Sequence, residues 1–131
     1  MIEFGGTFLD KARESATGAR VELENGRYNN SANRSYYAVF QAAIHALQFE
    51  GFQALRGEWG HDVVQAQFVG QLINRRHLYP TSLRSVLTEN RRLREDADYG
   101  MYRVSEVRAA RSLQRAERFV AARVQRQETG L

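Results

Sequence analysis

The sequence of 131 residues has no cysteine, one proline and a single lysine, and each scarcity narrows the class of protein. Without cysteine, neither a disulfide nor a thiolate-bound metal can form. The three histidines, His45, His61 and His77, are far apart in the chain and do not have the spacing of metal ligands. We therefore expect no metal site and no cofactor.

Long apolar runs are also missing from the sequence. No run reaches the roughly 20 residues that span a bilayer, and the opening stretch MIEFGGTFLDKA has no signal-peptide pattern. We expect a soluble, cytoplasmic protein that does not contact a membrane. The length is sufficient for a single domain, over residues 1–131, with a core of its own.

Positive charge is present in moderate excess, and almost all of it comes from arginine. The formal net charge is +4, and Lys11 is the one lysine among 19 basic residues. Arginine forms paired hydrogen bonds with phosphates and carboxylates and stacks on bases, so this bias favours a polyanionic partner. A GC-rich genome, whose codons favour arginine, is the alternative explanation.

The pattern of apolar residues predicts an all-α protein, because no strand-like alternation is present. In the third predicted segment, for example, Val64, Phe68 and Leu72 recur every four residues. Short connections between amphipathic helices favour antiparallel neighbours, and therefore an up-and-down bundle. The five predicted helices span residues 7–24, 30–50, 61–75, 81–99 and 104–127.

The second predicted helix has three distinct faces when its residues are placed about 100° apart. One face is an apolar core stripe, and another consists of small residues that let a second helix approach closely. The third face is polar and consists of Asn30, Arg34, Tyr37, Gln41, His45 and Gln48. Solvated faces are usually rich in Glu, Lys and Arg, so this face predicts a polar cleft or a dimer contact. An ordinary solvated face is the alternative.

The apolar stripe of the fourth predicted helix turns polar toward its C-terminal end. Asn90 and Arg94 continue the stripe and point toward the core, and Asp98 lies four residues after Arg94, within pairing distance. A partly buried charge is costly unless it is paired, so this predicts either an ion-pair brace or a functional cleft. The outward-facing charges are expected to be solvated, and these are Arg92, Glu95 and Asp96.

An arginine stripe follows the fifth predicted helix on the side opposite its core face. It consists of Arg108, Arg111, Arg115, Arg118 and Arg126. No acid of this helix interrupts the stripe, and arginines at this spacing repel each other unless an anion lies against them. We predict that the stripe binds nucleic acid or an acidic partner, with a solvated face as the alternative.

Two stretches of the sequence together resemble the HEPN family of small helical proteins. The first is RYNNSANRSYYAVFQAAIHALQ, residues 27–48, and the second is LREDADYGMYRVSEVRAARSLQRAERFVAAR, residues 93–123. The second contains the Arg-x-x-Ala-Asp-Tyr signature of one HEPN subfamily as Arg94, Ala97, Asp98 and Tyr99. The resemblance implies a four-helix up-and-down bundle with a fifth helix packed on it, a homodimer, and pairing with a minimal nucleotidyltransferase.

The resemblance also implies candidate catalytic residues. Many HEPN proteins are metal-independent ribonucleases, or toxins neutralised by the partner nucleotidyltransferase, with an Arg followed after four to six residues by a His. No histidine stands at that distance after the arginines at positions 91, 92 and 94, and Tyr99 lies where some family toxins carry a nucleotidylated tyrosine. Arg94, Asp98 and Tyr99 are therefore the catalytic candidates.

A literal Arg-to-His match occurs elsewhere, from Arg56 to His61 in the stretch RGEWGH. It lies in the loop before the third predicted helix, and arginine is abundant enough for such a match to arise by chance. We expect His61 to begin or cap that helix and not to act in catalysis.

Three functions follow from these patterns. The first is a HEPN module that partners a nucleotidyltransferase, in a toxin–antitoxin-type or defence system, and binds a nucleotide, RNA or the partner through a cleft between the second and fourth helices. The second is a metal-independent endoribonuclease that uses Arg94 with Asp98, Tyr99 or His45. The third is a structural dimer in which the Arg94–Asp98 pair only braces the bundle.

Overall fold

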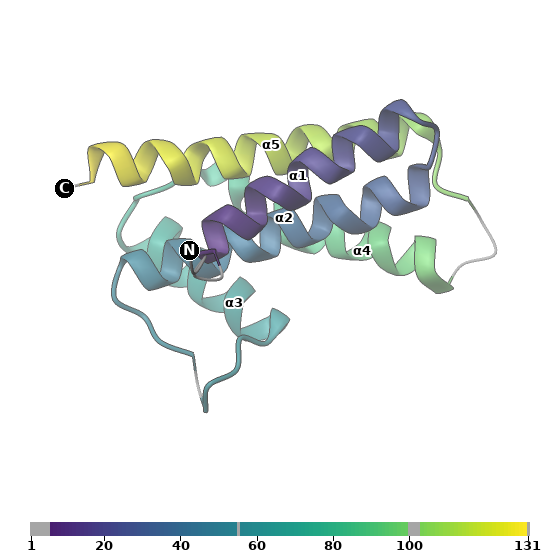
Figure 1. Ribbon diagram of the computed structural model, residues 1–131. Coiled ribbons are helices and arrows are strands. Elements are labelled where there is room, and N and C mark those ends of the chain that lie inside the picture. Colours follow the sequence, from purple (N-terminus) through teal and green to yellow (C-terminus); the bar gives the residue numbers. More distant parts are fainter. Residues whose placement is uncertain (1–5, 55, 100–102, 131) are drawn as a thin grey trace.

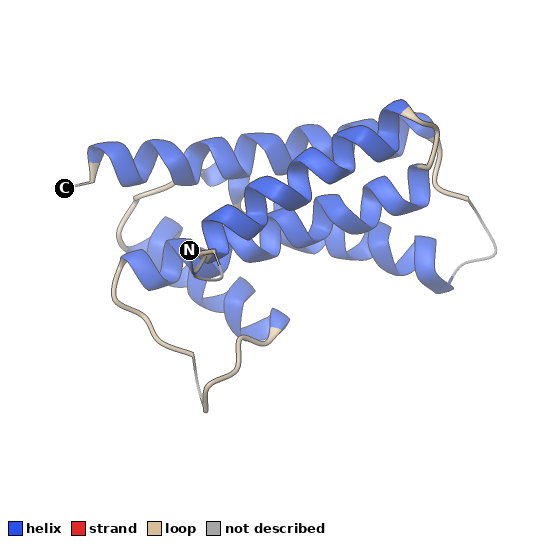
Figure 2. Ribbon diagram, in the orientation of Figure 1, coloured by secondary structure: helices blue, strands red, loops and turns tan. Residues whose placement is uncertain are grey.

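The computed structural model describes residues 6–54, 56–99 and 103–130. Two short segments join the α-helices: η1 (Phe68–Arg75) is a π-helical continuation of α3, and η2 (Thr81–Leu83) is a 3₁₀ turn. The α-helices are α1 (Phe8–Glu24), α2 (Tyr28–Phe49), α3 (His61–Gln67), α4 (Val86–Tyr99) and α5 (Glu106–Thr129). Figure 2 shows only helices and loops among the described residues, which confirms the predicted all-α class.

The four long helices lie side by side and alternate in direction (Figure 1). Helix α2 is central, because it packs against α1, α4 and α5, and the shorter α3 and η1 also contact it. The α1–α2 turn lies at the same end of the bundle as the C-terminal end of α4 and the start of α5. This arrangement confirms the up-and-down four-helix bundle with a fifth helix packed on it.

Local sequence accounts for several helix boundaries. Thr7 and Asp10 form a capping box at the start of α1, in which each side chain accepts from the other residue's backbone N–H at 3.1 Å. Gly26, with φ of 76°, makes the left-handed turn after α1. The Ser105 side chain caps α5 by accepting from Arg108 N at 3.2 Å. Helix α2 begins at Tyr28, two residues before its predicted start. Helix α5 begins at Glu106, two residues after its predicted start.

The third and fourth predicted helices are each divided in the structure. The third changes from α-helical to π-helical geometry at Phe68, and the Arg76 N–H bonds to Gln71 O, five residues back. The fourth starts as the 3₁₀ turn η2 directly after Pro80 and becomes α-helical only at Val86. The apolar residues of the predicted stripes are nevertheless buried, among them Val64, Phe68, Leu72 and Leu87, and Ile73 and Leu93 are buried in addition.

Two of the three predicted faces of α2 are buried against other helices. The small-residue face packs against α1, where Ser31 Oγ donates to the carbonyl of Ala19 at 2.8 Å. The members of that face are fully buried, and they are Ser31, Ser35, Ala38, Ala42 and Ala46. Helix α2 thus forms the centre of the core, and its polar face is the most exposed of the three.

Arg123 is fully buried, which the periodicity did not predict. Its Nη1 donates to Tyr79 Oη at 2.7 Å, and its guanidinium lies 4.2 Å from the centroid of the Phe49 ring. Three residues later, Arg126 forms a two-hydrogen-bond pair with Glu50 at 3.0 and 3.3 Å. Arg126 therefore belongs to the packing of α5 on the end of α2.

Within the described residues, no helix is long and apolar enough to cross a membrane.

Candidate functional site

Arg94 lies on two tyrosine rings at the contact between α4 and α2. Its guanidinium carbon is 5.2 Å from the ring centroids of both Tyr36 and Tyr37, and the two rings meet edge to face. Only 25% of the Arg94 side chain is exposed. The prediction that Arg94 points inward is confirmed, and the attraction between the cation and the ring faces holds it there.

The predicted pairing of Arg94 with Asp98 is present but loose. Arg94 Nε and Asp98 Oδ2 are 3.6 Å apart, which is too long for a hydrogen bond. Arg94 Nε is buried and has no hydrogen-bond acceptor among the described residues. Tyr99, by contrast, projects from the last turn of α4 with 84% of its surface exposed. Of the three catalytic candidates, only Arg94 and Asp98 are therefore brought together.

His61 comes from the start of α3 and joins the same cluster. As expected, it is the first residue of its helix. Its Nδ1 is hydrogen-bonded to Tyr36 Oη at 2.9 Å, and its ring stacks on Tyr36 and on Phe40. His61 and Arg94 are 33 positions apart in the sequence (94 − 61). In the structure, Tyr36 contacts both residues and so brings them into one cluster.

Arg91 supplies the second positive charge of the cluster. It pairs with Asp62 at 3.1 Å and with Glu95 at 3.0 Å, so Glu95 is not simply solvated as predicted. Burial lowers the pKa of His61 from 6.5, and the positive charge of Arg91 lowers it further. Both effects favour the neutral form of the His61 imidazole. We call this cluster the α2–α4 site, and it comprises Tyr36, Tyr37, His61, Arg91 and Arg94.

The polar face of α2 lines an open groove of about 480 Å³ on the side of α1. The Gln41 amide, oriented so that its nitrogen donates, reaches Ser15 Oγ at 2.7 Å and the Tyr37 carbonyl at 3.1 Å. The groove is lined by Ser15, Asn30, Asn33, Arg34, Tyr37 and Gln41. The predicted cleft therefore lies between α2 and α1 and not between α2 and α4. Tyr37 belongs to both the groove and the α2–α4 site.

His45 lies apart from the other predicted residues of this face. It stands eight residues after Tyr37 on α2, a rise of about 12 Å along the helix. Burial lowers its pKa, and the positive charge of Arg123 lowers it further. His45 is not among the residues that line the groove, and the charged residues that act on it are Arg123 and Asp10 and not Arg94.

Asn90 is fully buried as predicted, but it faces α5 instead of α2. Its Nδ2 donates to the Ser112 carbonyl at 3.2 Å, and its Oδ1 accepts from Arg115 Nε at 2.9 Å. Asn90 therefore does not line a cleft with the polar face of α2. Instead, it is the inner partner of the arginines on α5.

The arginine stripe of α5 is partly neutralised by acids of α4. Arg108 pairs with Asp96 and Arg115 pairs with Glu89, both at 3.4 Å, so Asp96 is not simply solvated as predicted. Arg118 is exposed and does not line any pocket formed by its neighbours in the stripe. A cavity of about 150 Å³ between α4 and α5 is lined by Leu93, Arg108, Arg111 and Arg115, and we call it the arginine pocket.

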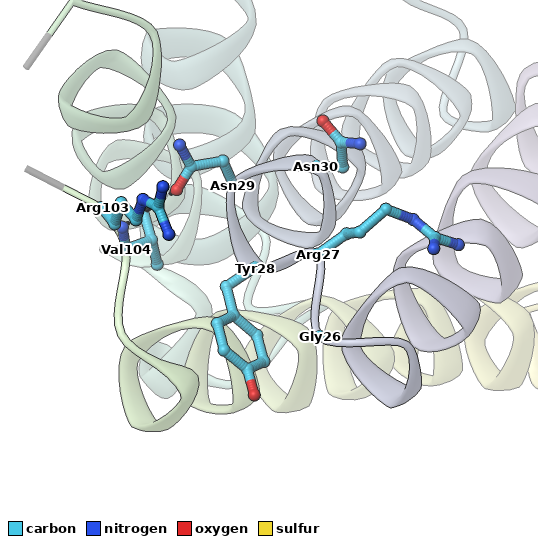
Figure 3. A pocket seen from close by; sticks show the side chains of 7 residues that line it. All are labelled: Gly26, Arg27, Tyr28, Asn29, Asn30, Arg103 and Val104. Carbon is cyan, nitrogen blue, oxygen red and sulfur yellow. Dashed lines mark hydrogen bonds between the residues drawn. The ribbon is translucent and has the colours of Figure 1, made fainter.

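A third hollow, of about 350 Å³, lies where α1 turns into α2 and where the chain enters α5 (Figure 3). Asn29 Oδ1 accepts from Val104 N at 2.9 Å and so fixes the segment before α5. In Figure 3 the side chains of Arg27 and Asn30 point away from Asn29 and Arg103, and Arg27 forms an ion pair with Glu22. Asn30 is the one predicted site residue that lines this hollow. The hydrogen bond between Asn29 and Val104 joins the start of α2 to the segment before α5.

The bundle and the sites around its fourth helix define a small all-α domain with two arginine-centred surfaces. The model of the HEPN domain matches residues 7–127, so the chain belongs to the HEPN family. The match includes both stretches on which the resemblance rested, residues 27–48 and 93–123. No curated protein matches the chain in sequence.

Proposed function

We propose that this HEPN protein is the partner of a minimal nucleotidyltransferase in a toxin–antitoxin-type or defence system, and that it binds a phosphate of a nucleotide or of RNA at the α2–α4 site. The supporting observation is the state of Arg94. Its guanidinium is held on the rings of Tyr36 and Tyr37, and its Nε is buried without a hydrogen-bond acceptor among the described residues. A quarter of the Arg94 side chain remains exposed, so the terminal nitrogens of a guanidinium held on these rings would donate to a phosphate oxygen.

The groove beside the α2–α4 site favours a single-stranded ligand. Asn30 and Asn33 offer amide groups of the kind that hydrogen-bond base edges, and no acid lines the groove. Tyr37 is 37% exposed and connects the groove with Arg94. Proteins that read single-stranded RNA combine aromatic rings with such polar groups, so bases in the groove would place phosphates near Arg94.

Binding to Arg94 is tested with a charge-matched pair of variants. We expect Arg94→Gln to weaken binding of a short single-stranded RNA by about tenfold, because a charge-assisted hydrogen bond is worth about 1.5–3 kcal/mol. Arg92→Gln removes the same charge from an exposed position of α4 and should change the affinity by less than about threefold. Equal affinities of the two variants would contradict the proposal, provided that circular dichroism shows both to be folded.

Partnership with a nucleotidyltransferase is tested independently of RNA. We expect a small nucleotidyltransferase gene beside the gene for this chain, and we expect the two proteins to co-purify when co-expressed. Gel filtration of the co-expressed proteins tests whether they elute together, and gel filtration of this chain alone measures the predicted homodimer. Separate elution of the two proteins would contradict the partnership and leave the RNA-binding test unaffected.

Endoribonuclease activity is the second candidate function, and the position of His61 favours it. In the tautomer whose Nδ1–H donates to Tyr36 Oη, Nε2 would be the atom that takes the proton of a ribose 2′-hydroxyl. The 2′-oxygen would then attack phosphorus, the 5′-oxygen would leave, and a 2′,3′-cyclic phosphate would form. Arg91 and Arg94 lie close enough to act on His61, so they would stabilise the charge on the phosphate.

Cleavage is measured in EDTA with the wild type, His61→Asn and Arg94→Gln. The enzyme hypothesis predicts a cyclic-phosphate product and at least about a 100-fold lower rate for His61→Asn, as is typical when a general base is lost. Binding without cleavage by the wild type would leave the partner module as the function. If Arg94→Gln lowers only the melting temperature, Arg94 is a brace of the bundle, and both candidate functions fail at this site.

A further inference from the structure

The arginine pocket concentrates positive charge on the side of α4 that faces away from the α2–α4 site. It is lined by Arg108, Arg111 and Arg115 of α5 and by Leu93 of α4. The three arginines are at positions i, i+3 and i+7, so α5 directs them to one side. Three guanidinium groups around one small cavity would repel each other without an anion between them.

Arg115 is held in position by a neutral group. Asn90, which is fully buried, accepts from Arg115 Nε and is itself fixed by its bond to the Ser112 carbonyl. Because Nε is the atom engaged by Asn90, the terminal nitrogens of Arg115 remain available on the side of the cavity. Burial lowers the pKa of Arg115, and the positive charges of Arg108 and Arg111 also lower it, against the opposing effect of Glu89.

The acids of α4 neutralise the pocket incompletely. Asp96 and Glu89 each lie 3.4 Å from an arginine nitrogen, whereas charge-assisted hydrogen bonds are usually about 2.7–2.9 Å long. Arg111 is exposed and forms no ion pair with any other described residue. Two loosely placed carboxylates thus face three guanidinium groups, and Glu89 and Asp96 are themselves about half exposed.

We propose that the arginine pocket is a phosphate-binding site, separate from the α2–α4 site, that takes one phosphate group between Arg108, Arg111 and Arg115. A tetrahedral phosphate presents several oxygens to donors that converge from different directions, and arginine is well suited to bind it. The cavity of about 150 Å³ has room for one such group. The site does not depend on the function proposed for Arg94.

Inorganic phosphate is the first probe of this site, measured by amide chemical shifts of the full chain. We expect saturable shifts around Leu93, Arg108 and Arg115, and about tenfold weaker binding in Arg111→Gln. Arg13→Gln, which removes an exposed arginine of α1, is the charge-matched control and should bind phosphate within about twofold of the wild type. Equal loss in both variants, or shifts that do not saturate, would overturn the proposal.

Removal of an acid provides a test with the opposite sign. Glu89→Gln removes the carboxylate that competes for Arg115 and should tighten phosphate binding by about three- to tenfold. If the arginines serve only as ion-pair partners of α4, Glu89→Gln lowers the melting temperature and leaves phosphate binding unchanged. That result would overturn the proposal even if Arg111→Gln proved too unstable to measure.

The source of the phosphate is identified with two RNAs of the same sequence, one with a 5′-phosphate and one with a 5′-hydroxyl, in an Arg94→Gln background. Tighter binding of the 5′-phosphorylated RNA that is lost in Arg111→Gln identifies a terminal phosphate. Equal binding of both RNAs that is weakened by Arg111→Gln identifies the backbone. Binding of both RNAs that is insensitive to Arg111→Gln excludes RNA as the source, and a site that still takes inorganic phosphate then binds a free phosphate.

Discussion

The two sides of α4 hold arginine in different ways. On the α2 side, Arg94 lies on two tyrosine rings and its Nε has no hydrogen-bond acceptor among the described residues. On the α5 side, Arg115 Nε donates a hydrogen bond to Asn90 Oδ1, and the same arginine is only loosely paired with Glu89. Contact with ring faces holds a guanidinium without using its donors, whereas an amide uses one donor and leaves the others. Both arrangements leave part of an arginine free for an external anion.

Among the substitutions that distinguish the two sides of α4, Asn90→Ala is expected to change the free energy of unfolding most. The substitution leaves the Ser112 carbonyl and Arg115 Nε without their partner in a buried position. We expect the free energy of unfolding to fall by about 2–3 kcal/mol, measured by chemical denaturation. Phosphate binding in the arginine pocket should weaken, while the effect of Arg94→Gln on RNA binding stays the same. Thr88→Ala, at an exposed position of α4, is the control and should change stability by less than about 0.5 kcal/mol.

The second effect concerns the stacking of Arg94. We expect Arg94→Met to lower the free energy of unfolding by about 1 kcal/mol, because a partly buried cation loses its contacts with two rings. The loss should be smaller by about 0.5 kcal/mol when Tyr37→Leu is already present, since one of the two rings is then absent. Strictly additive effects in this double-mutant cycle would show that stacking on Tyr37 does not hold Arg94.

The third prediction is a dependence of stability on pH. The pKa values of His61 and His45 are both lowered from 6.5 in the folded protein, mainly by burial. As pH falls through about 6.5, the unfolded chain takes up these protons before the folded chain does, so the free energy of unfolding decreases. Denaturation at about pH 7.5 and pH 5.5 measures this decrease, and His61→Asn should remove part of it. An unchanged pH dependence in His61→Asn would contradict the placement of His61 beside Arg91.

The smallest expected effect is that of Arg118→Gln. Arg118 is exposed and does not line the arginine pocket, so stability should change by less than about 0.5 kcal/mol. Its loss should reduce phosphate binding less than the loss of Arg111, through long-range charge alone. Equal reductions would show that α5 presents a continuous stripe, as the sequence predicted, and not a pocket.

The sequence was sufficient to predict the helices and the direction of Arg94. Apolar periodicity reports which side of a helix is buried, so the turn of a stripe from Leu87 to Asn90 and Arg94 could be read directly. Helix starts were less accurate: α2 begins two residues earlier than predicted, without a side-chain cap, and α5 begins two residues later, after the cap Ser105. The burial of Arg123 also escaped prediction, since its compensation comes from Tyr79 and Phe49, on other segments of the chain.

The composition of the sites could be predicted only in part, because periodicity does not say which helix covers a face. Asn90 was correctly placed inside, yet its neighbour is α5 and not α2. His61 follows a glycine-rich loop, and no spacing in the sequence indicates that Tyr36 brings it to Arg94. The acids opposite the arginine stripe were also present in the sequence as Glu89 and Asp96, but only helix packing brings them to it.

The most direct measurement of the central claim is the side-chain Nε–Hε NMR signal of Arg94 during titration with single-stranded RNA in EDTA. The signal is assigned by its absence in Arg94→Gln. We predict a saturable shift of the Arg94 signal, accompanied by a shift of the His61 ring, because a phosphate bound by the Arg94 guanidinium changes the electrostatic surroundings of both groups. An Arg94 signal that stays unchanged while RNA binds elsewhere would contradict the assignment of the α2–α4 site as the ligand site.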